Sequence, residues 1–291
     1  MRVILPSQFR AEMLFNQVEQ YFGRFEDLPE EVDFDFSQMR FARPSGVVFL
    51  SNLSRYLVRH GCSVVYTNMD NTTAAIRFLD DAMFFQQHLG HALTDTASIR
   101  PTTQPLRAIH HEESHGWIGF SFLPWLSHCC GVPIEHMAEL KTCLSELFNN
   151  IADHTDSGVG SIFAQWFPNE ASLEICIADF GQGIPETVGR VVDGLSDSQA
   201  IEMAFADGFS SRSQPTNQGV GLYYLQQNVV ENMSGTLTCL SAGGRLTINK
   251  VGNSVRKVPY NLRGYCPGTM IEITFRTDVL YQADEEGDFE W

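Results

Sequence analysis

Apolar positions recur with helical spacing in one segment near the middle of the chain. Leu140, Leu144, Leu147 and Ile151 are separated by four, three and four positions. A helix over this segment gathers them into one apolar stripe. Acids and an amide occupy the other side: Glu139, Glu146, Asn150 and Asp153. The pattern predicts an amphipathic helix whose polar face carries carboxylate and amide side chains.

Short apolar runs follow this helix and predict a β-sheet. Ser161–Phe167 and Leu173–Asp179 are rich in Ile, Phe, Trp and Leu, and Pro168-Asn169 separates them, which is typical of a hairpin. Residues 235–275 are also β-rich and end in the alternating run Met270–Phe275, so we expect them to complete the sheet.

The N-terminal third alternates between strand and helix patterns. Strands are expected at 2–5, 32–36 and 62–67, and helices at 7–21, 44–61 and 72–84. Such alternation predicts a small α/β domain. We therefore divide the chain into an N-terminal domain (1–93), a linker and packing helix between the domains or at a dimer face (94–135), a second α/β domain (136–280) and an acidic tail (281–291).

Composition narrows the classes of function. The 291 residues carry a formal charge of −16 with 19 scattered basic residues, so no nucleic-acid partner is expected. No apolar stretch is long enough to span a bilayer, and the N-terminus lacks a signal-peptide pattern. The seven cysteines form no CxxC pair and mostly lie in apolar runs, which indicates reduced core thiols and a cytoplasmic protein.

The polar face of the central helix could support catalysis. Glu146 and Asn150 are four residues apart and share one face. A carboxylate can polarise a water or hydroxyl, and an amide oxygen can join a Mg²⁺ shell. The alternative is an ordinary solvated face, which the helix alone favours.

Two glycine motifs follow the helix. Asp179-Phe180-Gly181-Gln182-Gly183-Ile184 places an acid before a tight turn, which permits close approach by a flat ligand such as adenine. Gly219-Val220-Gly221-Leu222 opens a helix whose free N–H groups suit phosphates. Each motif alone also fits a plain turn.

In this order and spacing the segments resemble the GHKL ATP-binding family of gyrases, heat-shock chaperones, histidine kinases and mismatch-repair ATPases. The resemblance implies an α/β sandwich, a mixed sheet with helices on one face, and the cofactors ATP and Mg²⁺. The resemblance implies that Glu146 is the catalytic base, that Asn150 is the Mg²⁺ ligand and that Asp153 belongs to the cofactor-binding residues. It also implies that Asp179 accepts a hydrogen bond from the exocyclic amine of adenine. The remaining cofactor-binding residues are then Gly181, Gly183, Ile184, Gly219, Val220, Gly221, Leu222 and Thr269.

Residues 193–218 are expected to form a mobile lid. Within it, Gly208-Phe209-Ser210-Ser211-Arg212 resembles the lid segment of several GHKL proteins. That match places Ser210, Ser211 and Arg212 near the phosphates. Arg212 suits bidentate phosphate contact, but a solvated loop arginine is an equal alternative.

The segment from Phe34 to Val47 resembles the STAS fold of bacterial anti-sigma-factor antagonists, in which a phosphorylatable serine opens a helix. Ser45 matches that serine, although Pro44 stands where the family usually has an acid. A capping role for Ser45 without phosphorylation is the favoured alternative.

Three alternative functions could use these residues. The first is an ATP-dependent signalling switch with ATPase or protein-serine kinase activity and a protein partner. The second is a histidine kinase, for which His110, His111, His115 and His128 lack a recognisable phosphoacceptor motif. The third is a non-catalytic, nucleotide-gated binder or dimer. The His110–His115 cluster invites a metal, but a solvated polar turn is the favoured interpretation.

Overall fold

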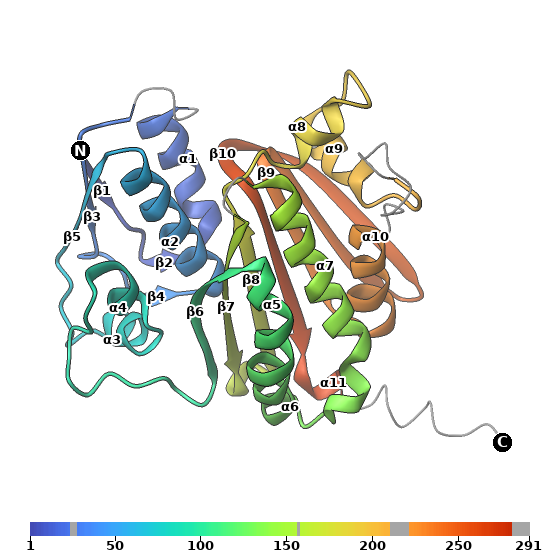
Figure 1. Ribbon diagram of the computed structural model, residues 1–291, viewed down its shortest axis with the longest axis horizontal. Coiled ribbons are helices and arrows are strands. Elements are labelled where there is room, and N and C mark those ends of the chain that lie inside the picture. Colours follow the sequence, from blue (N-terminus) through green and yellow to red (C-terminus); the bar gives the residue numbers. More distant parts are fainter. Residues whose placement is uncertain (24–27, 156–157, 210–220, 281–291) are drawn as a thin grey trace.

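The chain forms three layers around one central sheet (Figure 1). This computed structural model describes residues 1–23, 28–155, 158–209 and 221–280. An N-terminal α/β unit packs on one face of the sheet, and the helices that follow it pack on the other. The expected α/β architecture is confirmed.

The N-terminal unit has the predicted alternation of strands and helices. β1 (Arg2–Ile4), β3 (Glu31–Asp35) and β5 (Ser63–Thr67) pair in parallel in that order, and β2 (Gln8–Phe9) pairs with β4 (Phe41–Ala42). The helices of this unit are α1 (Ala11–Phe22), α2 (Pro44–Arg59), α3 (Ala74–Asp81) and α4 (Phe84–Leu89). The single helix expected over 72–84 is divided because Met83 adopts a left-handed φ of 68°.

The central sheet has the order β6-β7-β8-β10-β9. Its strands are β6 (Thr103–His110), β7 (Val159–Phe167), β8 (Ser172–Asp179), β9 (Thr236–Val251) and β10 (Ser254–Arg276). All four neighbouring pairs are antiparallel, so the expectation of a mixed sheet is wrong. The predicted β7–β8 hairpin is confirmed, and Gly252, with a φ of +59°, lies between β9 and β10.

The stretch expected to be a linker and packing helix contributes to the sheet and its helical layer. β6 is an edge strand of the sheet. α5 (His111–Trp117), a π-helical turn (Ile118–Phe122) and α6 (Leu123–Cys130) follow, then a 3-10 turn (Ile134–Met137). These helices share a core with α7 (Ala138–His154), on the side of the sheet away from the N-terminal unit (Figure 1). They therefore do not lie between the two units.

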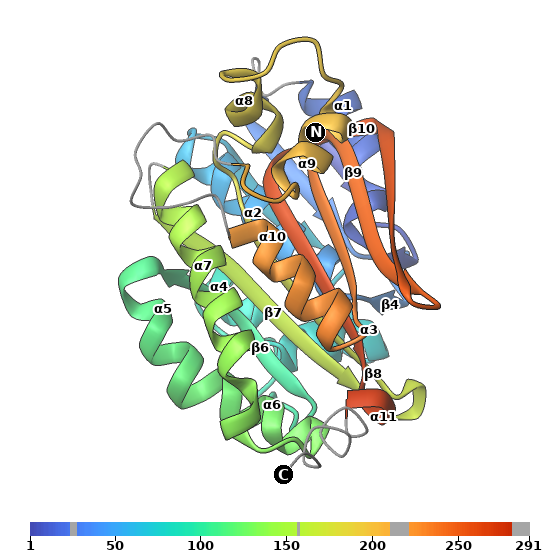
Figure 2. The ribbon, with the colours of Figure 1, turned by 90° about the vertical axis from the view of Figure 1, so that its right-hand side faces the viewer.

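The remaining helices lie along α7 and the last two strands, the first two near one end of the sheet and the last at the opposite end, beside α6 (Figure 2). They are α8 (Ile184–Gly189), α9 (Asp197–Ala204), α10 (Gly221–Gln226), a π-helical turn (Gln227–Asn232) and α11 (Thr277–Leu280). Ser196 caps α9 through a capping box with Gln199. The next residue, Asp197, accepts a 2.7 Å hydrogen bond from the backbone N–H of Gly243.

Apolar burial joins the N-terminal unit directly to the sheet. The aromatic core of this unit, which includes Phe9, Phe15 and Phe49, also contains Cys176 and Met270 on the sheet face that the unit covers. A second core fills the space between the opposite face of the sheet and α5, α6 and α7. All seven cysteines are buried and unpaired, as expected for core thiols.

Candidate functional site

The polar face of α7 carries the first two site residues. The predicted apolar stripe is buried against the sheet, with Leu140, Leu144, Leu147 and Ile151 each at most 4% exposed. Glu146 and Asn150 lie half-buried on another side of the helix. Asn149 donates a 3.4 Å hydrogen bond to Glu146. Burial of the stripe thus fixes the carboxylate and the amide one turn apart.

The first turn of α10 lies against these two side chains. A Cβ atom built on Gly221 would stand 3.5 Å from Asn150 Nδ2 and 3.8 Å from Glu146 Oε2. Two segments separated by some seventy residues therefore meet, as the motif order predicted. Because Gly221 has no side chain, space remains in front of the carboxylate and the amide.

The end of β8 supplies the predicted acid. Asp179 is 8% exposed and its Oδ1 accepts a 2.7 Å hydrogen bond from the Gly181 N–H. Burial raises the pKa of the Asp179 carboxyl to about 6, against the lowering effect of backbone hydrogen bonds from Gly181 and Thr269. A buried acid with a displaced pKa at the end of a strand is typical of a ligand site.

The glycine turn after Asp179 packs on the end of α7. A Cβ on Gly181 would stand 2.2 Å from the His154 carbonyl oxygen, so a side chain is not tolerated there. The Gln182 N–H also donates to that carbonyl at 3.2 Å. These contacts bring Asp179 and the helix bearing Asn150 into one site.

A buried serine fixes the other side of the turn. Ser241 of β9 donates to the Gly268 carbonyl at 2.5 Å and accepts from the Ile184 N–H at 2.9 Å. Thr269 pairs in the ladder with both Asp179 and Ser241. Gly183 has a φ of +81°, and a Cβ there would approach Ser241 Oγ to 2.8 Å. Sequence reasoning missed Ser241, because only the register across three strands brings it to the turn.

Other predicted positions take less central places. Leu222 and Ile184 are half-buried and pack against the core beside α9, and Asp153 is exposed on α7. Ser210, Ser211, Arg212, Gly219 and Val220 lie outside the described residues, as does the acidic tail at 281–291. Their expected roles therefore stay predictions.

Ser45 lies on the opposite face of the sheet and caps no helix. Arg43 is the N-cap residue of α2, and Ser45 sits in the first turn, 4% exposed. Its hydroxyl hydrogen-bonds to Glu272, a half-buried residue of β10. The capping interpretation is therefore wrong, and the hydroxyl is inaccessible to a phosphate donor in this conformation.

The histidine cluster is helical and not the expected polar turn. His111 and His115 lie on α5, and His110 is its N-cap residue. In the part of the chain that the structure describes, no three His, Cys, Asp or Glu side chains gather as a metal site.

Comparison with known protein families finds a match in the C-terminal half of the chain. Residues 136–278 match the family described as "Histidine kinase-, DNA gyrase B-, and HSP90-like ATPase". Residues 136–278, called the GHKL domain below, are therefore similar to this family of ATPases. The match supports nucleotide binding, with ATPase-type or kinase-type activity in general. No curated protein matches the chain. Among the described residues, no helix has the length and apolarity needed to cross a membrane.

The side chains in the GHKL domain fit a Mg²⁺–nucleotide. Glu146 and Asn150 offer the oxygen donors that Mg²⁺ requires, and the missing Gly221 side chain leaves room before them. Asp179 offers a buried acceptor at the other end of the site.

Proposed function

We propose that the GHKL domain binds Mg²⁺–ATP and that the N-terminal unit converts nucleotide occupancy into a signal to a protein partner. Asp179 accepts a hydrogen bond from the exocyclic amine of adenine. Asn150 would hold Mg²⁺ through its amide oxygen. Ser210, Ser211 and Arg212, with the backbone at Gly219–Gly221, contact the phosphates.

The chemistry assigned to this site is phosphoryl transfer. Glu146 takes a proton from a water or a serine hydroxyl as its oxygen attacks the γ-phosphorus. The bond to the bridging oxygen breaks, and ADP leaves. With water the product is phosphate, and with a serine hydroxyl it is a phosphoserine. Bound Mg²⁺ supplies charge neutralisation at the phosphate oxygens.

One observation carries this proposal: a Cβ atom built on Gly221 of α10 would lie within 4 Å of both Glu146 and Asn150 on α7. A solvated helix face, the alternative for these two residues, needs no glycine-started helix opposite it. Their juxtaposition across some seventy residues favours a shared ligand.

The signalling role rests on the joint core of the two units. α2 packs on β7 and β8, and Asn52 of α2 hydrogen-bonds Ser161 of β7. A change in the nucleotide domain that alters this packing would alter the surface of the N-terminal unit. Because Ser45 is buried in the same interface, a serine acceptor is better sought on a partner than in this chain.

Two alternatives remain. A nucleotide-gated binder or dimer would use the same pocket without turnover. A histidine kinase is less well supported, because the His110–His115 cluster lies at the end of β6 and on α5, packed with the sheet and helices of residues 136–278, and not on a separate dimerisation helix.

ADP release from the full chain, compared with the Glu146→Gln variant, tests the proposal. We expect slow turnover in the wild type, its loss in the variant, and ATP–Mg²⁺ binding by calorimetry in both. Binding without ADP release in either protein would favour the gated binder. If neither protein binds ATP–Mg²⁺, the proposal is wrong.

Labelled ATP separates kinase from ATPase activity. Label in free phosphate indicates hydrolysis, and label on protein indicates transfer. Mass spectrometry of the Ser45 peptide then shows whether the buried serine is ever an acceptor.

A further inference from the structure

The outer edge of the central sheet is basic. In a chain with a formal charge of −16, residues 244–265 contain five basic residues and no acid: Arg245, Lys250, Arg256, Lys257 and Arg263. They belong to the part of β9 and β10 that forms the right-hand edge of the sheet in Figure 2. We call residues 244–261 of these strands the basic hairpin. A surface whose charge opposes that of the whole chain is suited to an acidic segment.

One strand of the basic hairpin has a free edge. Residues 254–261 of β10 pair with residues 244–251 of β9, whereas β8 pairs only with residues 269–276 of β10. In the part of the chain that the structure describes, no strand pairs with the other side of 254–261. Pro259 fits this position, because proline lacks an N–H group and occurs on edge strands. The free edge therefore offers unpaired backbone groups to an added strand.

The side chains along this edge combine positive charge with apolar surface. Arg256, Val258 and Tyr260 alternate along the strand and lie on one face, and Lys257 lies on the other. Arg256 is exposed, and no ion pair joins it to a carboxylate of the described residues. Val258 is 40% exposed and Tyr260 is 57% exposed. A strand added at the edge presents side chains to both faces, so it meets both cations.

Other cations of the basic hairpin already have partners. Arg245 forms an ion pair with Glu12 at 2.7 Å. Lys257 donates to a backbone carbonyl at 3.1 Å, and two carboxylates lie near it. Arg256 is therefore the cation of the free edge that lacks such a match among the described residues. Charged side chains on an edge strand discourage pairing with an apolar strand, and they favour a strand that carries acids.

Residues 281–291 have the complementary composition. They contain neither Lys nor Arg and have five acids: Asp284, Glu285, Glu286, Asp288 and Glu290. Most of these acids come first, and the aromatic residues Phe289 and Trp291 come later. On the free edge the two cations likewise precede the exposed Val258 and Tyr260. A parallel alignment therefore sets acids against cations and aromatic rings against apolar surface.

Residues 281–291 also start at the end of the sheet from which the free edge can be reached. Thr274, near the end of β10, pairs with the first residue of β9. The hydroxyl oxygens of Thr238 and Thr247 are 3.4 Å apart, so the two halves of β9 lie side by side. Because neighbouring strands are about 4.8 Å apart, Arg256 lies roughly 15 Å across the sheet from Thr274. A segment of this length spans about 36 Å when extended, so it can enter the free edge at the Arg256 end and run parallel to it.

We propose that residues 281–291 dock on the free edge of the basic hairpin in the same molecule and add a parallel strand beside residues 254–261. The acids of the segment contact Arg256 and Lys257, and its aromatic side chains cover the apolar surface that follows them. This docking surface shares no residue with the proposed nucleotide site, so the docking does not depend on ATP.

Hydrogen exchange of the full chain tests the proposal, by comparing the wild type with a variant that combines Asp284→Asn, Glu285→Gln and Glu286→Gln. The amides of residues 254–261 should exchange at least about tenfold faster in this triple variant, because the charge-assisted contacts that hold the added strand are lost. Arg256→Gln should accelerate the same amides, because it removes the other partner of these contacts. The amides of β8, in the middle of the sheet, should exchange at the wild-type rate.

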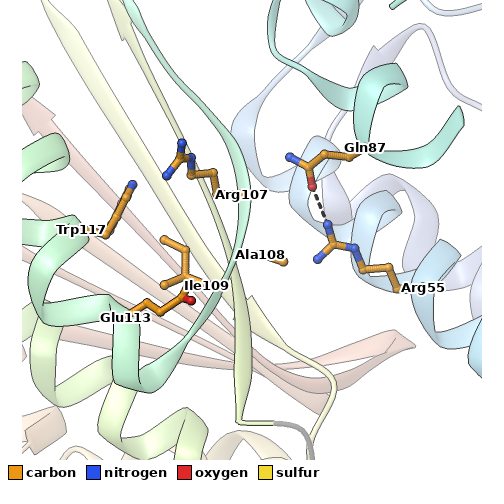
Figure 3. A pocket seen from close by; sticks show the side chains of 7 residues that line it. All are labelled: Arg55, Gln87, Arg107, Ala108, Ile109, Glu113 and Trp117. Atoms are coloured by element: carbon orange, nitrogen blue, oxygen red, sulfur yellow. Dashed lines mark hydrogen bonds between the residues drawn. The ribbon is translucent and has the colours of Figure 1, made fainter. Parts of the chain in front are cut away.

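Arg107→Gln is the matched control. Arg107 is exposed and projects from β6, the strand at the opposite edge of the same sheet (Figure 3). Its substitution should leave the exchange of residues 254–261 unchanged. The proposal is overturned if the triple variant and the wild type exchange alike at these residues, or if Arg107→Gln accelerates them as much as Arg256→Gln does. Protection that falls when the wild type is diluted would identify a second copy of the chain as the occupant and would also overturn the proposal.

Discussion

Asp179 combines a buried carboxylate with a glycine turn, and substitution can separate its binding role from its structural role. Asp179→Asn keeps the acceptor for the Gly181 N–H but replaces the free oxygen with an amide donor. We expect ATP affinity to fall at least about tenfold, because the new side-chain amide and the exocyclic amine of adenine are both hydrogen-bond donors. Calorimetry with ATP and Mg²⁺ measures this loss.

Stability supplies the control for Asp179→Asn. Because burial raises the pKa of Asp179 to about 6, its ionised form destabilises the folded state at neutral pH. Removing the charge should leave Tm unchanged or higher. A variant that melts earlier and binds less would indicate a folding defect and contradict the assigned role.

Gly221 tests the other end of the site. In Gly221→Ala the new methyl group stands near Asn150 and Glu146, in the space assigned to Mg²⁺ and phosphate. We expect weaker ATP binding together with a gain of up to about 1 kcal/mol in helix stability, since alanine favours helix over glycine. Gly189→Ala is the matched control, because a Cβ there meets nothing within 4 Å. Equal ATP affinity in both variants would contradict our placement of the phosphates.

At the scale of elements, the periodic patterns predicted most of the fold. The stripe on α7 and the β7–β8 hairpin follow directly from the spacing of apolar residues. The glycine motifs predicted where chain segments approach closely, and Gly181 and Gly221 do so. Each of these features depends on residues that are close together in the sequence, so the sequence alone is enough to predict it.

Features that depend on distant partners were not accessible from sequence. The antiparallel pairing of β8 with β10, which places β10 between β8 and β9, joins residues about ninety positions apart, such as Asp179 and Thr269. Ser45 carries the sequence context of a helix start, but its hydroxyl binds Glu272, more than two hundred residues away. Residues 105–109 are a strand candidate in the sequence, but β6 begins earlier, at Thr103 in the polar stretch expected to be a linker, because Thr103 pairs with Gln165 of β7.

Two aromatic contacts join α2 to the turn after Asp179, for which we propose adenine binding. Phe180, the residue after Asp179, lies 5.8 Å from Phe49 and 5.9 Å from Tyr56, measured between ring centroids. Because the turn is held by α2 as well as by α7, Phe180→Leu should loosen Asp179. We expect ATP affinity to fall about fivefold, the equivalent of about 1 kcal/mol for an aromatic pair.

Phe78→Leu is the control for this coupling. Phe78 is also half-buried and also crosses from the N-terminal unit to the sheet, with its ring 5.9 Å from that of Phe163. The Phe78→Leu variant should lower Tm about as much as Phe180→Leu does, but its ATP affinity should equal that of the wild type. If both variants bind ATP equally well, α2 does not position the adenine turn.

At the scale of the whole molecule, polar contacts accompany the core that joins the two units. Arg43 at the start of α2 forms ion pairs with Glu174 at 2.8 Å and Glu170 at 3.1 Å, on β8 and its hairpin. Deeper in the same interface, Glu272 is half-buried and hydrogen-bonds Ser45. Charged groups approach it from three further elements: Glu12 on α1, Glu174 on β8 and Arg245 on β9.

This interface should make stability depend on pH. Burial raises the pKa of Glu272 from 4.5 to about 7, so the folded state holds this proton more tightly than the unfolded chain does. The stability it contributes is therefore present below pH 4.5 and is lost as the pH rises through 7. Complete loss amounts to about 3 kcal/mol, since each pKa unit corresponds to about 1.4 kcal/mol.

Glu272→Gln isolates this effect, because the amide is neutral at every pH and can still hydrogen-bond Ser45. Between pH 6 and 8 the wild type should lose stability in urea unfolding, whereas the variant should change little and be the more stable protein at pH 8. Asp179, with a pKa of about 6, contributes mainly below this window. Glu186→Gln, an exposed acid paired with Arg190 on α8, should keep the wild-type pH dependence. A Glu272→Gln variant that still loses stability between pH 6 and 8 would show that this carboxyl does not control how tightly the two units pack.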